Sequence, residues 1–167
     1  MSTALRVLVL SDTHVGPKGK RDLPAEVWSM VEDADVVLHA GDIKTDDFLA
    51  RLEGAAVTYA VAGNNDVDMA SPPPEVRHLD LAGVAVAMVH DAGPALGRAR
   101  RMQRRFPDAS LVVFGHSHVP YDQVGAGGQR LFNPGSPTLR RRQPHHTLGQ
   151  LVLEAGDIVD HRILRLD

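Results

Sequence analysis

The chain has 167 residues, with 18 Lys and Arg, 21 Asp and Glu, nine His and a formal charge of −3 at pH 7. This length is typical of one domain that builds its own core, so we expect a single domain over residues 1–167. Because the sequence contains no cysteine, zinc fingers, iron–sulfur clusters, thiol nucleophiles and disulfide scaffolds are excluded. The acidic residues comprise sixteen Asp and five Glu, so short carboxylates and imidazoles are abundant.

The apolar runs are shorter than the roughly 20 residues that a membrane-spanning helix needs. The first run, 7–10, is also too short for the core of a signal peptide. We therefore expect a cytoplasmic protein with no membrane partner.

Five short apolar runs, rich in Val and Leu, each end in polar or glycine-containing residues. Near-continuous runs of this length predict strands that are buried on both faces, as in sheets covered by helices. The predicted strands are 6–10, 35–39, 58–61, 84–89 and 111–114.

Helices are predicted between these strands, over 24–32, 46–52 and 94–106, and Thr45 is a candidate cap for the second helix. Farther along, two extended segments at 120–132 and 148–164 contain glycine-bearing turns that predict hairpins. Strands that alternate with helices predict an α/β fold. We expect two sheets that pack face to face, with the helices outside.

Each predicted strand ends in a motif that is weak when it stands alone. An Asp at such a position often caps a helix, a Gly-Asn-Asn-Asp segment suits a turn, and a lone His is usually a core residue. Two imidazoles at i and i+2 after a buried strand are harder to explain by packing, because burying both without a partner is costly. The motifs are Asp12-Thr13-His14, Gly41-Asp42, Gly63-Asn64-Asn65-Asp66, His90 and Gly115-His116-Ser117-His118.

In this order, the five motifs resemble those of the calcineurin-like metallophosphoesterases, and specifically their small bacterial and archaeal phosphodiesterase branch. The resemblance extends over essentially the whole chain and includes the segment 133–136. It implies a four-layer α-β-β-α sandwich of two mixed sheets flanked by helices. It also implies an enzyme, a phosphodiesterase that hydrolyses small phosphoesters by attack of a hydroxide that bridges two metal ions.

The resemblance implies a ligand set for two divalent ions. The first ion would be held by Asp12, His14 and His118, the second by Asn64, His90 and His116, and Asp42 would bridge them. Oxygen and nitrogen donors without a thiolate suit Mn, our first choice, and also Fe, Ni, Co or Zn. Two such ions would lower the pKa of a bridging water and neutralise phosphoryl oxygens.

Three positions beside these ligands are also informative. Asn65 stands where the larger phosphatases have a His that protonates the leaving group, and an amide cannot act as a general acid. We therefore expect weaker activity on esters with poor leaving groups. Asp66 is expected to orient a ligand or its loop. Asp91, where many relatives have Gly, is interpreted as a cap for the helix near Pro94, with support of a His ligand as the alternative.

The remaining histidines and the basic runs have simpler interpretations. His39 is expected to be structural, and His78 and His161 are expected in strands. His145 and His146 belong to a stretch, 140–146, that is either solvated surface or a rim attracting a substrate phosphate. The basic residues of 98–105 are interpreted as a solvated helix face, so a nucleic-acid partner is not favoured.

Two further hypotheses remain open. The retromer subunit has the same fold and works through protein contacts, so a non-catalytic scaffold is an alternative, although that subunit departs from the ligand pattern that is complete here. A nuclease or a cyclic-nucleotide phosphodiesterase would share the chemistry and differ in substrate. Assembly into a homo-oligomer is also left open.

Overall fold

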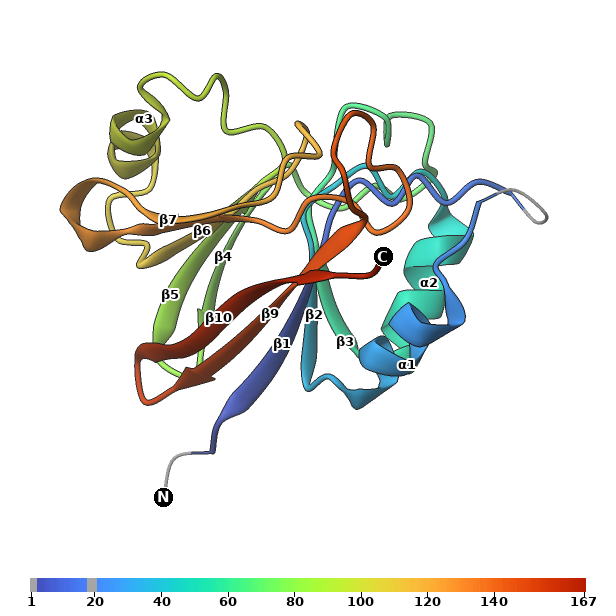
Figure 1. Cartoon of the computed structure of the whole chain (residues 1–167), viewed down its shortest axis with the longest axis horizontal. Helices are drawn as coiled ribbons and strands as arrows, with labels where there is room; N and C mark the ends of the chain where they lie inside the picture. Colours follow the sequence, from blue (N-terminus) through green and yellow to red (C-terminus); the bar gives the residue numbers. More distant parts are fainter. Residues whose placement is uncertain (1–2, 18–20) are drawn as a thin grey trace.

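The computed structural model describes residues 3–17 and 21–167, and Figure 1 shows its arrangement. The described strands form two sheets of five strands each. The strand order is β10-β9-β1-β2-β3 in the first sheet and β4-β5-β6-β8-β7 in the second.

The first sheet is built from an alternating half and a hairpin. Its strands β1, β2 and β3 are parallel, and helices α1 and α2 connect them. The hairpin of β9 and β10 adds antiparallel strands beside β1. The bounds are β1 Leu5–Leu10, α1 Ala25–Asp33, β2 Val36–His39, α2 Asp46–Ala55, β3 Val57–Ala60, β9 Thr147–Glu154 and β10 Asp157–Arg165.

The second sheet has parallel strands in its middle and antiparallel pairs on either side. Strand β6 lies parallel to β5 and β8, while β4 pairs with β5 and β7 with β8 in antiparallel fashion. The bounds are β4 Val76–Leu81, β5 Val84–Val89, α3 Arg98–Arg105, β6 Leu111–Val113, β7 Tyr121–Val124, the short 3-10 turn Ala126–Gly128 and β8 Arg130–Asn133.

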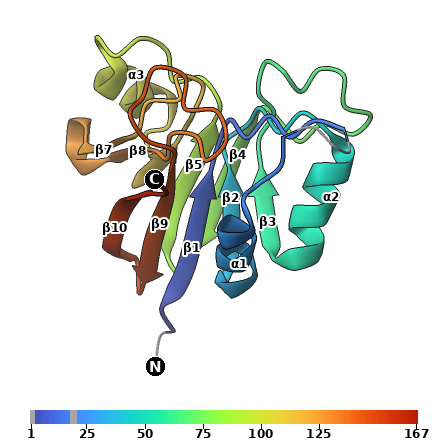
Figure 2. The same cartoon turned by 45° about the vertical axis from the view of Figure 1, so that its right-hand side comes forward.

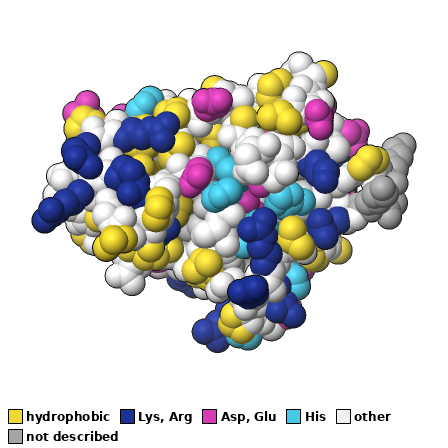
Figure 3. All heavy atoms as spheres, turned by 90° about the horizontal axis from the view of Figure 1, so that it is seen from above, with side chains coloured by type: hydrophobic (Ala, Val, Ile, Leu, Met, Phe, Trp, Pro, Cys, Tyr) yellow, Lys and Arg dark blue, Asp and Glu magenta, His cyan; other side chains and the backbone are white. Residues whose placement is uncertain are grey.

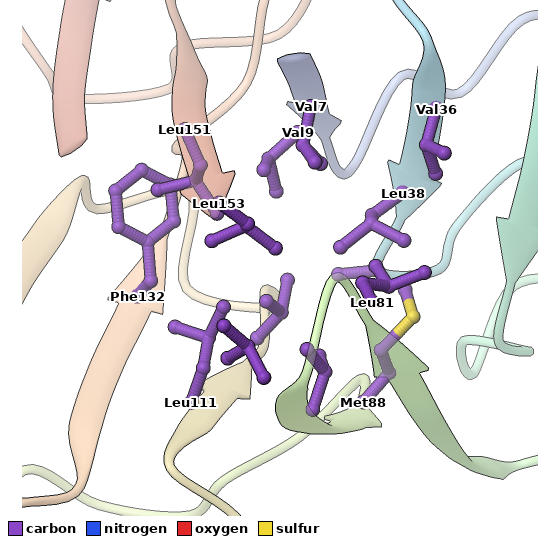
Figure 4. Close-up of a cluster of buried hydrophobic side chains, with 14 of the residues drawn as sticks. Val7, Val9, Val36, Leu38, Leu81, Met88, Leu111, Phe132, Leu151 and Leu153 are labelled. Carbon is purple, nitrogen blue, oxygen red and sulfur yellow. The ribbon is translucent and has the colours of Figure 1, made fainter. Parts of the chain in front are cut away.

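The two sheets pack face to face around a central apolar cluster, shown in Figure 4. Strand β1 explains why the apolar runs are continuous: Val7 and Val9 point into this cluster, whereas Leu8 and Leu10 pack against the layer of α1 and α2. On the other side, a third cluster joins the second sheet to α3. Figure 2 shows the helices on the outside of the sheets, so the expected α-β-β-α sandwich is confirmed.

All five predicted strands are confirmed, with ends that differ by at most one residue. The predicted hairpin turns also fall between β7 and β8 and between β9 and β10, and Thr45 Oγ1 accepts a hydrogen bond from the backbone N–H of Phe48 (3.3 Å). Strand β4 was expected only as a strand around His78, without bounds and outside the five apolar runs, because polar residues interrupt it and much of it is only half-buried.

The third helix is shorter than predicted. It begins at Arg98 rather than near Pro94, since Gly97 just before it has a left-handed backbone (φ 75°). Among the described residues, no helix combines the length and the apolar character needed to cross a membrane.

Candidate metal centre

The candidate ligands meet at one edge of the molecule because the strands that precede them run in the same direction. Strands β1, β2 and β3 are parallel, as are β5 and β6, so their carboxyl ends lie on the upper face in Figure 1. Seen from above, histidine and acidic side chains gather near the middle of this face, with Lys and Arg beside them (Figure 3).

A first group of donors consists of Asp12, His14 and His118, and all three are buried. One ligand atom from each lies within 4.8 Å of the others. The Nε2 of His118 is 3.4 Å from Oδ1 of Asp12. One carboxylate and two imidazoles therefore face a common point.

A second group shares Asp12 and adds Asp42 and His90. One ligand atom from each of these residues again lies within 4.8 Å of the others. The Nε2 of His90 is 3.5 Å from Oδ2 of Asp42 and 3.8 Å from Oδ1 of Asp12. The same Oδ2 of Asp42 is 3.4 Å from Nε2 of His14. The carboxylate of Asp42 therefore lies between the imidazoles of the two groups.

Asn64 and His116 extend the second group toward solvent. The Oδ1 of Asn64 is 3.1 Å from Nε2 of His90 and 3.2 Å from Nδ1 of His116. The side chain of His116 is 45% exposed, whereas that of His118 is fully buried. The structure thus brings all seven predicted ligands together and opens the cluster on the side of His116.

The buried donors fit a divalent cation. Within the described part of the chain, Oδ1 of Asp12 and the Nε2 atoms of His14 and His118 are buried without a hydrogen-bond partner, an arrangement that is costly unless a ligand satisfies them. The Nδ1 of His118 contacts the carbonyl of Leu139. A carbonyl only accepts, so this Nδ1 donates and leaves Nε2 with a lone pair for a metal.

His90 is oriented in the same way. Its Nδ1 donates to the carbonyl of Ala40 over 2.7 Å, which directs Nε2 toward the carboxylates. Burial lowers the pKa of His90, but Asp42 and Asp12 raise it more, so the net pKa lies above its ordinary value. Burial raises the pKa of Asp42, yet hydrogen bonds from His90 and Asn65 bring it well below its usual range. A cation bound here would therefore displace a proton.

The backbone of the site is strained. Five of the seven candidate ligands have positive φ angles, a region that residues other than glycine rarely adopt. Such conformations cost of order 1–3 kcal/mol each and cluster at functional sites. The five are Asp12 (54°), His14 (47°), Asp42 (59°), His116 (71°) and His118 (61°).

Two glycines allow the motifs to approach one another closely. A Cβ at Gly63 would lie 2.1 Å from Oδ1 of Asp42, and one at Gly115 would lie 1.9 Å from Oγ of Ser11. Side chains at these positions would therefore displace Asp42 or the segment before Asp12.

Asp66 connects the loops of Asp42 and Asn64. Its Oδ2 accepts from the backbone N–H groups of Asp42 (2.9 Å) and Gly63 (2.8 Å), and its Oδ1 accepts from the N–H of Lys44 (2.7 Å). Asn65 contributes differently: its backbone N–H donates to Oδ1 of Asp42 (3.0 Å) and its side-chain amide to Oδ2 (2.8 Å). The amide therefore contacts the carboxylate that lies between the two groups.

The segment after β8 supports the first group, a role that sequence reasoning missed although it had singled out 133–136. Ser136 Oγ donates to the carbonyl of Asp12 (2.8 Å), and Thr138 Oγ1 donates to the carbonyl of Thr13 (2.6 Å). Only the family resemblance pointed to this segment. Hydrogen bonds from a side chain to a backbone carbonyl more than a hundred residues away produce no recognisable pattern in the local sequence.

The interpretation of Asp91 as a helix cap is wrong. Because α3 begins at Arg98, Asp91 is too far from its first turn, and its Oδ1 instead accepts from the N–H of Gly93 (2.7 Å). Its Oδ2 lies 3.9 Å from Nε2 of His116, which is longer than a hydrogen bond, so the alternative, support of a His ligand by Asp91, stays a prediction.

The basic face of α3 is only partly solvated, which corrects a second interpretation. The guanidinium of Arg101 donates to the carbonyls of Ala92 (2.8 Å) and Pro94 (2.6 Å). Arg98 donates to the carbonyl of Gly93 (3.1 Å) and lies over the ring of Phe114 (4.9 Å). Two of the five basic residues thus order the loop after His90.

The histidines outside the cluster occupy structural positions. The fully buried His39 accepts from the N–H of Gly41 at Nδ1 (3.1 Å) and contacts Thr13 Oγ1 through Nε2 (2.9 Å). Burial lowers the pKa of His39 to about 3. His78 and His161 lie in β4 and β10, while His145 and His146 contact Asp167.

This fold is that of a known class of proteins. The chain belongs to the calcineurin-like phosphoesterase superfamily, whose model matches residues 5–163. A probable metallophosphoesterase of Methanothermobacter thermautotrophicus is 32% identical over 142 residues, which cover 80% of this chain and 77% of that protein. Among solved structures, a Thermotoga maritima protein has a TM-score of 0.73 at 30% identity, covering 97% of this chain and 99% of its own.

Vacuolar Protein Sorting 29 from Cryptosporidium parvum is also similar, with a TM-score of 0.82. It is 21% identical, and the match covers 98% of this chain and 92% of that one. At this identity the likeness concerns the fold. The chain therefore has the fold of a group that includes both metallophosphoesterases and a protein named for vacuolar sorting.

Proposed function

We propose that this protein is a phosphodiesterase that hydrolyses small phosphoesters and depends on two divalent ions. The observation that carries the proposal is the set of buried, unpartnered ligand atoms on Asp12, His14 and His118. In a protein without a bound cation, burying these atoms would destabilise the fold, because no hydrogen bond offsets the loss of their hydration. In a metallophosphoesterase they are the atoms that a cation would satisfy.

Each ion would have its own ligands. Asp12, His14 and His118 would hold the first ion, Asn64, His90 and His116 the second, and Asp42, whose Oδ2 lies between His14 and His90, would be shared. When bound, the ions supply charge to polarise phosphoryl oxygens and to activate water. The donors are oxygen and nitrogen only, so Mn is our first choice, with Fe, Ni, Co and Zn as alternatives.

The chain's own residues orient these ligands. Asn65 and Asp66 hold Asp42 through its carboxylate and its backbone N–H, while backbone carbonyls fix the rings of His90 and His118. Asn65 cannot deliver a proton to the leaving group. The proposal therefore includes a preference for esters whose leaving groups depart without protonation.

The test is hydrolysis of bis(4-nitrophenyl) phosphate and 4-nitrophenyl phosphate by metal-stripped protein to which Mn, Fe, Ni, Co or Zn is added. We expect turnover that requires added metal, is faster on the diester, and is lost in Asp42→Asn and His116→Ala. Absence of turnover with every ion would overturn the proposal. Thermal unfolding of each variant checks that it is folded.

A second candidate is a non-catalytic scaffold, favoured by the likeness to Vacuolar Protein Sorting 29. A scaffold would keep its affinity for a protein partner after metal is removed and would not hydrolyse either ester.

Cyclic nucleotides and single-stranded nucleic acid should be tested as substrates beside the two nitrophenyl esters. The cytoplasmic location and the oligomeric state stay predictions, which fractionation and light scattering would test.

A further inference from the structure

The two sides of the candidate metal centre differ in shape. On the side of Asn64, His90 and His116, a cavity of about 460 Å³ opens between the loop after β3 and the end of β5. Cavities that enclose drug-sized molecules start near 300 Å³, so this one has room for much more than a phosphate group. An ester bound at the centre can therefore place an organic arm here.

The walls of this cavity favour an arm without negative charge. Val67, Pro72 and Pro73 provide apolar surface, and the carboxylates of Glu75 and Asp91 also line the cavity. One cation, Arg105, also lines the cavity. A second anionic group on the arm would meet like charges, which is costly, whereas an uncharged arm would not.

The opposite side of the centre carries a turn that is fastened to the first group of ligands. The carbonyl of Leu139 contacts Nδ1 of His118, and Thr138 is bonded to the carbonyl of Thr13. Four residues after Leu139, Gln143 donates its N–H to the carbonyl of Arg140 (3.0 Å) and closes the turn. The backbone beside His118 thus fixes where this turn stands.

Arg141 is the second residue of this turn and has a left-handed backbone (φ 53°). The guanidinium of Arg140 is used within the turn, because it donates to the carbonyl of Gln143 (2.6 Å). Arg141 is exposed, and among the described residues no carboxylate forms an ion pair with it.

We propose that the substrate lies across the centre in one orientation, with an uncharged organic arm in the cavity beside His116 and a non-bridging phosphoryl oxygen toward Arg141. Arg141 then acts as a specificity-determining residue, because a guanidinium binds phosphoryl oxygens through charged hydrogen bonds. The substrate class is a phosphoester with a bulky neutral group. This inference rests on the proposed function, since it takes a phosphoester as the ligand.

The test measures binding of two probes, phenyl phosphate and inorganic phosphate, to Mn-loaded protein by titration calorimetry. Ala62 lines the cavity without being a candidate ligand, so Ala62→Leu narrows the space for the arm. We expect Ala62→Leu to weaken phenyl phosphate about tenfold and inorganic phosphate less than about twofold. Ala70→Leu, an exposed position outside the cavity lining, is the matched control and should leave both affinities unchanged.

Arg141→Gln is expected to weaken both probes about tenfold, the size of a lost charged hydrogen bond. Arg142→Gln, the neighbouring exposed arginine, is its control and should change neither. A third probe, 4-carboxyphenyl phosphate, should bind more weakly than phenyl phosphate, because its arm carries a negative charge into the cavity.

The inference is overturned if Ala62→Leu weakens both probes equally, if Arg141→Gln behaves like Arg142→Gln, or if the carboxylated probe binds as well as phenyl phosphate. Because the test compares affinities and not rates of hydrolysis, the two proposals can fail separately. If the protein hydrolyses esters but the variants do not change the probe affinities selectively, only the proposed orientation is rejected. If the probes bind selectively but no ester is hydrolysed, the orientation is supported and the proposed phosphodiesterase activity is rejected.

Discussion

Asn65 holds the carboxylate of Asp42 at both oxygens, through its backbone N–H (3.0 Å) and its side-chain amide (2.8 Å). The sequence indicated only what an amide at this position lacks, the ability to donate a proton. The structure adds what it does, which is to fix the carboxylate between His14 and His90.

Removing this amide is expected to loosen the site without unfolding the protein. In Asn65→Ala, Asp42 keeps the backbone N–H but loses one of its two bonds, so we expect Mn to bind about tenfold more weakly, as is typical when a partner of a ligand is removed. Calorimetric titration of the metal measures this directly. Asp68→Ala, an exposed change in the same loop, is the control, and equal affinities in the two variants would refute the assigned role.

Replacing Asn65 by His tests the expected dependence on the leaving group. An imidazole can donate a proton, and general acids contribute about 10²–10⁴-fold to such steps. We expect Asn65→His to raise kcat for an alkyl ester more than for a 4-nitrophenyl ester, whose leaving group needs no proton. The measurement is the slope of log kcat against leaving-group pKa, and an unchanged slope would show that another group supplies the proton.

The sequence predicted much of the fold because the apolar pattern reports burial directly. Strand β1 is apolar at every position from Val7 to Leu10 since it is covered on both faces, and the strand ends were readable from where that pattern stops. The bounds of the half-buried β4, where a strand was expected around His78, and the start of α3 were not readable, because alternating polar residues and a left-handed Gly97 depend on tertiary context.

The site was predictable in its residue types and not in its geometry. The order of the five motifs brought the right donors together, since parallel strands end at one edge. Nothing in the sequence shows that Asp12 and His118 have left-handed backbones. The bonds from Ser136 to Asp12 and from Asp66 to three backbone N–H groups join distant loops, and local sequence patterns do not encode such pairings.

Asp66 is expected to contribute to stability as well as to geometry. It is 1% exposed and accepts three backbone N–H groups, which Asp66→Ala would leave unpartnered. Unsatisfied buried groups cost about 1–3 kcal/mol each, so we expect a loss of at least about 3 kcal/mol in the free energy of unfolding. Urea denaturation measures it. Asp66→Asn keeps an acceptor and should lose less; an equal loss in both variants would contradict this account.

Metal addition should stabilise the protein through the same buried atoms. A ligand at 100 times its Kd stabilises the folded state by about 2.7 kcal/mol, so Mn should raise the Tm of the stripped protein. We expect Asp42→Asn to abolish most of this shift, because its carboxylate lies between the two groups. Asp108→Asn, at an exposed position, should retain it. A shift that survives in Asp42→Asn would place the metal elsewhere.

His39 gives the protein an acid-sensitive core. Its ring is fully buried with both nitrogens in use, and burial lowers its pKa to about 3. In the unfolded chain a histidine takes up a proton near pH 6.5, so the unfolded state binds more protons below that pH. The stability that His39 contributes is therefore complete above about pH 6.5 and is lost as the pH falls toward 3, at up to about 1.4 kcal/mol per pH unit.

We expect His39→Gln to be less stable than the parent at pH 7 and to lose stability less steeply between pH 6.5 and 4.5. Urea unfolding of the stripped proteins at several pH values measures both slopes, and since the other histidines are common to the two chains, identical slopes would mean that His39 is protonated in the folded state.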